Sequence, residues 1–179
     1  TELCFGALPM GPRQKNMTIE DCTKVIVAAL EKGINFVDTA QMYETYQPIR
    51  EAMKITGIRP VITSKSVAST YEDMEKAVNE ALEQLDIDYI DIFLLHAARE
   101  SIDVYEKRAG ALECLKAYKA KGLIKAIGIS THNTRVAKMT AQRQDIDVIF
   151  CLINKSGRGL LEGGIPDMIE AIRLNSDAG

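Results

Sequence analysis

The chain has 179 residues, of which 46% are hydrophobic and 26% charged, and its formal net charge is −3. These values are typical of one globular domain with a substantial core. Its basic residues are scattered and no apolar run reaches about 18 residues, so we expect no nucleic-acid partner and no membrane span. The N-terminus lacks a signal-peptide pattern, and the four cysteines lie far apart without a C-x-x-C pair. We therefore expect a cytoplasmic protein with reduced thiols and no metal site.

Short apolar stretches alternate with helical patterns along the whole chain. Thr18, with Asp21 three residues later, nearly forms a capping box, and Gly33 is typical of the end of that first helix. The predicted strands are residues 3–9, 34–37, 60–64, 89–95, 124–129 and 148–153. The predicted helices are residues 18–33, 48–54, 70–85, 109–121, 134–143 and 166–174.

A strand followed by a helix, repeated six times, predicts a parallel sheet covered by helices. An open doubly wound sheet would place a glycine-rich dinucleotide loop after the first strand, and residues 4–11 hold no such motif. The better choice is an α/β fold of the (β/α)8 TIM-barrel type. Because that barrel ordinarily has eight units and about 250 residues, we expect residues 1–179 to form a single incomplete barrel domain with about six units. A complete six-unit protein is the alternative, although it would leave two unpaired sheet edges.

Four polar residues, Asp38, Lys65, His96 and Ser130, stand just past the predicted ends of the second to fifth strands, and Tyr43 follows Asp38 by five residues. The carboxyl ends of barrel strands converge on one face, where such barrels build their sites. Each residue also has an ordinary structural explanation: an aspartate can cap a helix, a tyrosine can pack, and a lysine or histidine can serve a loop. Their coincidence at one face favours a catalytic site.

These residue types suit acid–base chemistry on a carbonyl group. A tyrosine with a reference pKa of about 10 is a poor acid near neutrality, and we expect the Lys65 ammonium to lower that pKa while Asp38 holds the lysine. His96 can donate a hydrogen bond to a substrate carbonyl and stabilise its developing charge. The set therefore suits protonation of a carbonyl oxygen while hydride reaches its carbon.

Four segments resemble the aldo-keto reductase family: residues 33–43 (GINFVDTAQMY), 62–65 (ITSK), 85–96 (LDIDYIDIFLLH) and 122–130 (GLIKAIGIS). The resemblance implies an enzyme that reduces aldehydes or ketones with NADPH, NADH being the alternative cofactor. By that match Tyr43 would be the proton donor, Lys65 and Asp38 would tune it, and His96 would orient the carbonyl.

The same resemblance assigns the cofactor to later parts of the chain. Ser130 would bind the nicotinamide carboxamide. Thr131 stands where the family usually has asparagine, and Asn154 stands roughly where it often has glutamine. The basic residues that grip the cofactor phosphates near the eighth strand are absent, so we expect a chain truncated in this way to have negligible affinity for NADPH.

Two further points follow from the resemblance. The variant at residues 130–133 looks more like a bacterial subgroup, some members of which carry a C-terminal iron–sulfur domain. The alternative function is a non-catalytic redox sensor or regulatory subunit that binds a nucleotide on the same fold. The expected partner is a small carbonyl compound, while the sequence predicts neither its identity nor the oligomeric state.

Overall fold

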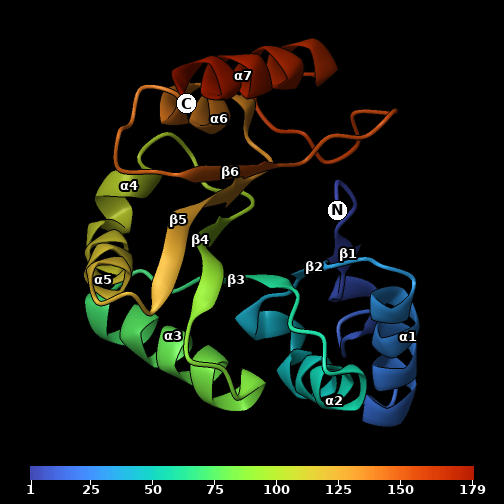
Figure 1. Cartoon of the computed structure of the whole chain (residues 1–179). Coiled ribbons are helices and arrows are strands. Elements are labelled where there is room, and N and C mark those ends of the chain that lie inside the picture. Colours follow the sequence, from blue (N-terminus) through green and yellow to red (C-terminus); the bar gives the residue numbers. More distant parts are fainter.

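The computed structural model describes residues 1–179 and contains one sheet of six parallel strands, paired in sequence order from β1 to β6. The sheet is curved, and the helices lie along its outer side (Figure 1). This confirms the predicted α/β barrel architecture, of which six strands are present. The strands are β1 (Phe5–Gly6), β2 (Phe36–Asp38), β3 (Val61–Ser66), β4 (Ile90–Ala97), β5 (Ile124–Thr131) and β6 (Val148–Cys151).

The helices follow the predicted alternation with the strands. The long ones are α1 (Ile19–Glu31), α2 (Tyr46–Thr56), α3 (Tyr71–Leu85), α5 (Ala109–Ala120) and α7 (Ile165–Ala178). The short ones are α4 (Val104–Lys107), α6 (Thr134–Thr140) and the 3-10 helices η1 (Leu8–Met10) and η2 (Gln41–Tyr43). No helix is both long enough and apolar enough to cross a membrane.

The first helix has the ends that the sequence predicts. The Thr18 hydroxyl accepts a hydrogen bond from the backbone N–H of Asp21 at 3.1 Å, which satisfies one of the free donors of the first turn. At the other end Gly33 has φ +88°, and its N–H donates to the carbonyl of Leu30. Because a left-handed residue lets the chain turn directly into β2, this glycine sets the short connection to the first site residue.

The main core lies between the sheet and the helices that cover its outer side. Residues that alternate along β4, such as Phe93 and Leu95, are fully buried in it together with Met74 and Leu85 of α3. The intervening residues of β4 face the concave side of the sheet, because successive side chains of a strand point to opposite faces. The site residues occupy this concave side.

Several element boundaries differ from the predictions, and β6 ends two residues earlier than predicted. Strands β3, β4 and β5 each end two residues later than predicted, because their hydrogen-bonded pairing continues through polar residues that carry no apolar signal. The first strand is shorter than predicted, since η1 replaces its second half. The turn α4 had no periodic pattern long enough to predict it.

Candidate active site

The predicted site residues lie within their strands and not beyond them, which corrects the sequence-based placement. Asp38 is the last residue of β2, while Lys65, His96 and Ser130 are the second-to-last residues of β3, β4 and β5. Strand pairing sets His96 directly beside Ser130. Paired residues share a face of the sheet, so both side chains lie on its concave side.

Lys65 and Asp38 form a buried ion pair. The Lys65 ammonium donates to the Asp38 carboxylate at 2.5 Å and to the carbonyl of Thr39 at 2.7 Å. The lysine is 2% exposed and the aspartate 7% exposed. Burial raises the pKa of Asp38 and lowers the pKa of Lys65, and the attraction between the two charges opposes both shifts. The attraction and the hydrogen bond between the two groups therefore hold the pair together against the cost of its burial.

Tyr43 stands beside this pair at the end of η2. The Lys65 Nζ atom lies 4.9 Å from the centre of the Tyr43 ring, and the His96 ring meets that ring edge-on with the two centroids 5.9 Å apart. Gly11, in the loop after η1, lies so close to Tyr43 that a Cβ atom there would come within 2.4 Å of the tyrosine carbonyl oxygen. The backbone of Tyr43 is thus fixed by packing from the loop of the first unit.

The pKa of Tyr43 is shifted in the direction opposite to the one we predicted. Burial, with a smaller contribution from the Asp38 carboxylate, raises the pKa of Tyr43 to about 12. We predicted that Lys65 would lower this pKa. Its charge is instead committed to Asp38 and to the carbonyl of Thr39, so the phenol faces a nearly neutral pair. Tyr43 is therefore a protonated phenol at neutral pH.

His96 is held in the neutral form. Burial, followed by the positive charges of Lys65 and Arg108, lowers its pKa to about 4. Its Nδ1 atom is buried and has no hydrogen-bond partner. A neutral imidazole can donate one hydrogen bond and accept another. Since the unpartnered Nδ1 is itself buried, the nitrogen available to a ligand on the concave side is Nε2, which makes no hydrogen bond with the protein and is not fully buried.

The three predicted cofactor residues are not brought together. Ser130 lies on the concave face next to His96. Thr131 points to the opposite face, and its hydroxyl accepts a hydrogen bond from the N–H of Asn133 at 3.0 Å. Asn154 lies beyond β6, and its amide bonds only within its own loop, to Ser156 and Arg158. Of these three residues, only Ser130 has a side chain on the concave face that makes no hydrogen bond with the protein.

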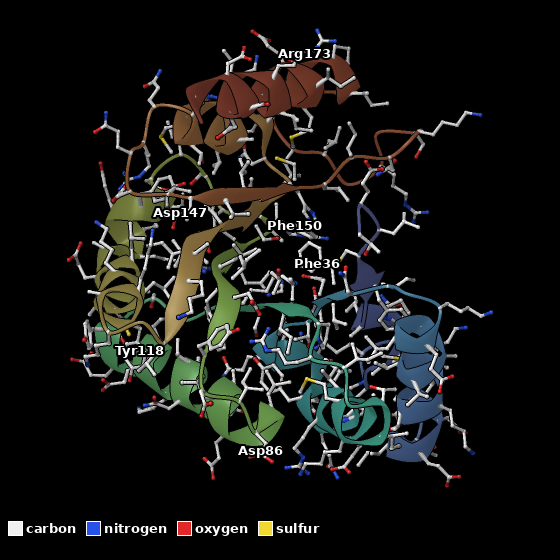
Figure 2. All side chains as sticks on the ribbon, viewed as in Figure 1. Phe36, Asp86, Tyr118, Asp147, Phe150 and Arg173 are labelled. Carbon is white, nitrogen blue, oxygen red and sulfur yellow. The ribbon has the colours of Figure 1, made fainter.

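Two residues at the site were not predicted from the sequence. The ring of Phe150 in β6 lies 5.5 Å from Lys65 Nζ, and Figure 2 shows this side chain together with Phe36 of β2 on the inner side of the curved sheet. The parity of strand β6 could have indicated Phe150. The second is Arg108, whose guanidinium donates to the carbonyl oxygen of His96 at 3.1 Å. No local pattern signals that contact.

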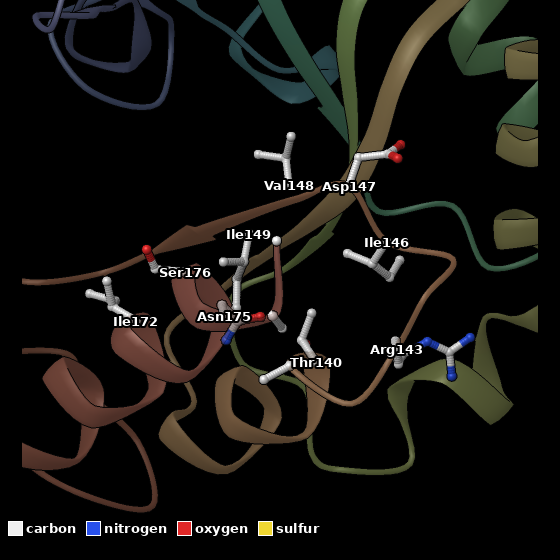
Figure 3. Close-up of a pocket in the computed structure, with 12 residues that line it drawn as sticks. Thr140, Arg143, Ile146, Asp147, Val148, Ile149, Ile172, Asn175 and Ser176 are labelled. Atoms are coloured by element: carbon white, nitrogen blue, oxygen red, sulfur yellow. The ribbon is translucent and has the colours of Figure 1, made fainter.

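A separate pocket of about 320 Å³ lies between α6, β6 and α7 and contains none of the predicted residues (Figure 3). Its lining includes Asp147 and Val148, which stand at the beginning of β6, the end of the strand opposite the site. No group of three or more histidine, cysteine, aspartate or glutamate side chains is arranged to hold a metal ion.

The fold and site define a parallel α/β half-barrel with polar residues at its strand ends. The sequence model described as "Aldo/keto reductase family" matches residues 2–155, so the chain belongs to this family, as the resemblance implied. An aldo-keto reductase structure from Pseudomonas aeruginosa covers 98% of this chain and 68% of its own, with a TM-score of 0.79 and 21% identity. That likeness shows the fold.

Curated relatives match somewhat less than two thirds of the chain. A methylglyoxal reductase of Escherichia coli is 32% identical over 114 residues, which are 62% of this chain and 40% of the relative. A glyoxal reductase of Bacillus subtilis is 34% identical over 115 residues, again 62% and 40%. An NAD/NADP-dependent indole-3-acetaldehyde reductase of Schizosaccharomyces pombe is 33% identical over 121 residues, 64% and 40%. The chain thus matches about 40% of the length of each of these relatives.

Proposed function

We propose that this protein reduces the carbonyl group of a small aldehyde or ketone to an alcohol, with NADPH as the reductant and Tyr43 as the proton donor. One observation carries the proposal. The Tyr43 phenol and the His96 imidazole lie side by side on the concave face next to Ser130, and none of these three side chains makes a hydrogen bond with the protein. Of their polar atoms only His96 Nδ1 is fully buried, so the Tyr43 and Ser130 hydroxyls are open to a ligand, and the convergence of three uncommitted polar groups favours a binding site there.

The tyrosine is suited to donate its proton late in the reaction. With a pKa of about 12, Tyr43 keeps its proton at neutral pH and yields it only to a stronger base. The alkoxide formed from a reduced carbonyl is such a base, because an alcohol is a weaker acid than a phenol. The Lys65 Nζ atom lies 4.9 Å from the centre of the Tyr43 ring, but its charge is largely compensated by Asp38, so the phenol keeps its high pKa until the alkoxide forms.

The neutral His96 supplies the second contact with the substrate. Since its pKa is held near 4, the imidazole at neutral pH can donate one N–H to the carbonyl oxygen without carrying a charge of its own. Such a donor orients the carbonyl beside the phenol and stabilises charge that develops on its oxygen. In this proposal His96 orients the substrate carbonyl and Tyr43 transfers the proton.

The residues fit the nicotinamide end of the cofactor. NADPH would supply the hydride when bound. The Ser130 hydroxyl has no protein partner and could bind a carboxamide there, whereas the Asn154 amide is occupied by its own loop. We propose Ser130 as the main side-chain contact for that group, with Thr131 and Asn154 as weaker candidates. Names of the relatives include both NAD and NADP, and preference for NADPH remains our proposal.

The names of the relatives favour small reactive aldehydes as substrates. Two of them are a methylglyoxal reductase and a glyoxal reductase. We propose a 2-oxoaldehyde as the first substrate to test.

Tyr43→Phe tests the function directly. In the protein that contains this chain, methylglyoxal-dependent oxidation of NADPH should fall by about 10²–10⁴-fold, the usual contribution of a general acid. Tyr46→Phe is the matched control. Tyr46 is also buried, but its hydroxyl bonds Ser64 at 2.6 Å on the helix side of the sheet. This control should keep activity within about threefold. A Tyr43→Phe enzyme with undiminished turnover would rule the proposal out.

A further inference from the structure

Arg108 is a buried cation to which the proposed chemistry gives no role. It stands at the junction of α4 and α5, outside the sheet, and is only 6% exposed. Buried arginines are rare unless their donors are matched by acceptors. The hydrogen-bond acceptors of the Arg108 guanidinium show which segments of the chain it connects.

Its guanidinium joins two points on the chain that follow each other at the end of β4. One nitrogen donates to the carbonyl oxygen of His96 at 3.1 Å, and the other donates to the carboxylate of Glu100 at 2.6 Å. The planar fork thereby fixes the distance between the strand end and the loop four residues later. A lysine has the same charge but cannot reproduce this geometry.

The loop held by Arg108 is tied to the next unit as well. The side-chain amide of Asn133 donates to the carbonyl of Glu100 at 3.1 Å, and its oxygen accepts from the N–H groups of Arg135 and Val136 at the start of α6. The N–H of His132 donates to the carbonyl of Ala98 at 3.1 Å. The end of β4 is therefore braced from α5 on one side and from the β5–α6 loop on the other.

We propose that Arg108 is a positioning residue for the reaction, which holds the backbone of His96 so that its ring stays edge-on to Tyr43. This inference rests on the proposed function for its catalytic meaning, although the geometric claim is independent of it. Arg108 touches the carbonyl of His96 and not the ring, so it acts through the strand. A shift of the reacting groups by about 1 Å is enough to slow an enzyme strongly.

The charge of Arg108 acts in the same direction as its geometry. The groups whose positive charge disfavours an imidazolium at His96 are Lys65 from β3, Arg108, Arg13 after η1 and, when it is protonated, His132 after β5. Arg108 thus helps to keep the ring neutral while fixing its place. Its two contributions can be separated by replacing it with lysine or with methionine.

The first measurement is the contact between the His96 and Tyr43 rings, detected by NMR as a nuclear Overhauser effect between their protons. The chain has only two histidines, so a His132→Gln variant assigns the signals. Both Arg108→Lys and Arg108→Met should weaken this effect. Arg108→Met should also raise the pKa of His96 above about 4, by only part of the shift because burial and Lys65 still lower it, whereas Arg108→Lys should keep it low.

Arg59→Met is the matched control. Arg59 likewise donates to a backbone carbonyl and a carboxylate, those of Tyr89 and Asp91, but it does so at the opposite end of β4. The Arg59→Met variant should be less stable, but the nuclear Overhauser effect between the His96 and Tyr43 rings and the pKa of His96 should both stay unchanged. If Arg108→Lys folds and keeps the full ring contact, Arg108 is not a positioning residue. This variant decides the question even if Arg108→Met fails to fold.

Turnover gives the second readout in the protein that contains this chain. Arg108→Lys should lower kcat for methylglyoxal on the order of tenfold and change KM by less than about threefold, because the ring is misplaced while the pocket is kept. Equal kcat values in the two enzymes would also overturn the proposal. An inactive wild type would count against the proposed function, whereas the ring contact would still test the role of Arg108.

Discussion

At the scale of single residues, the site depends on how burial changes the proton affinities of neighbouring groups. Tyr43 and His96 are shifted in opposite senses: the phenol becomes a weaker acid, and the imidazole becomes a weaker base. Both shifts come mainly from removal from water, and both keep the side chain neutral at physiological pH. Lys65 and Asp38 can remain charged in the same surroundings because they face each other at 2.5 Å. The site thus has two neutral groups beside one compensated pair.

The pKa of His96 predicts how stability depends on pH. The folded chain holds this pKa near 4, whereas the unfolded chain restores about 6.5, so between these values the unfolded chain binds the proton more tightly. The stabilising contribution of the neutral ring is therefore complete above pH 6.5 and is lost as the pH falls toward 4. Between pH 6.5 and pH 4 we expect the protonation of His96 to lower the free energy of unfolding by about 2 kcal/mol, a value reduced to allow for its partial exposure.

The measurement is the free energy of urea unfolding at both ends of that pH range, for the wild type and His96→Asn. Asp38 and the other carboxylates titrate in both proteins, so their effects cancel in the comparison. The variant should lose about 2 kcal/mol less than the wild type between pH 6.5 and pH 4. Parallel curves for the two proteins would show that His96 is not buried in the neutral form.

At the scale of elements, the loop after η1 fixes the position of η2 and therefore of Tyr43. Gly11 has an extended backbone with φ −69°, which any residue can adopt, so its only constraint is the Tyr43 carbonyl that a Cβ would meet at 2.4 Å. Gly11→Ala should therefore force the two loops apart. We expect a loss of about 1–3 kcal/mol in stability and a lower kcat.

Gly6→Ala is the control for this prediction, because a Cβ at Gly6 in β1 would meet no atom within 4 Å. It should change unfolding free energy and turnover little. Thermal unfolding and steady-state reduction of methylglyoxal measure both effects. If Gly11→Ala is as stable and active as Gly6→Ala, the contact with Tyr43 does not constrain the site.

The same scale shows how much the sequence alone could predict. All six strands and the helix after each were predicted, because near-continuous apolar strands and amphipathic helices give strong periodic signals. The N-terminal cap at Thr18 was predicted from its own local chemistry, and Thr70 caps α3 in the same way in the structure. The ends of β3, β4 and β5 were placed too early, since pairing between neighbours extends β5, for example, through Ser130 and Thr131 although neither is apolar.

The candidate site was predictable only where a residue follows from its own strand. Asp38, Lys65 and His96 could be placed together because parallel strands end at one face. Arg108 could not, since its contact with His96 depends on how α5 packs against β4. The direction of the shift at Tyr43 was also missed, because the sequence shows that a lysine is near but not that its charge is already neutralised by Asp38.

At the scale of the whole molecule, the curved sheet has two open edges. In this structure β1 pairs only with β2, and β6 pairs only with β5. Phe150, in the middle of β6, faces the concave side and is 38% exposed. An exposed edge with an apolar side chain on it is a template for pairing with another chain. We therefore expect the 179-residue chain, produced by itself, to associate as its concentration rises.

Phe150→Ser should weaken that association by removing the apolar side chain from the edge strand. The control is Ile55→Ser on α2, where the isoleucine is more exposed, at 65%, but lies on a helix. If association depended only on exposed apolar surface, Ile55→Ser would weaken it more. If it depends on pairing at the sheet edge, Phe150→Ser should weaken it more. Sedimentation velocity over a range of concentrations distinguishes the two. A wild-type chain that stays monomeric throughout would show that the folded edges are protected from pairing.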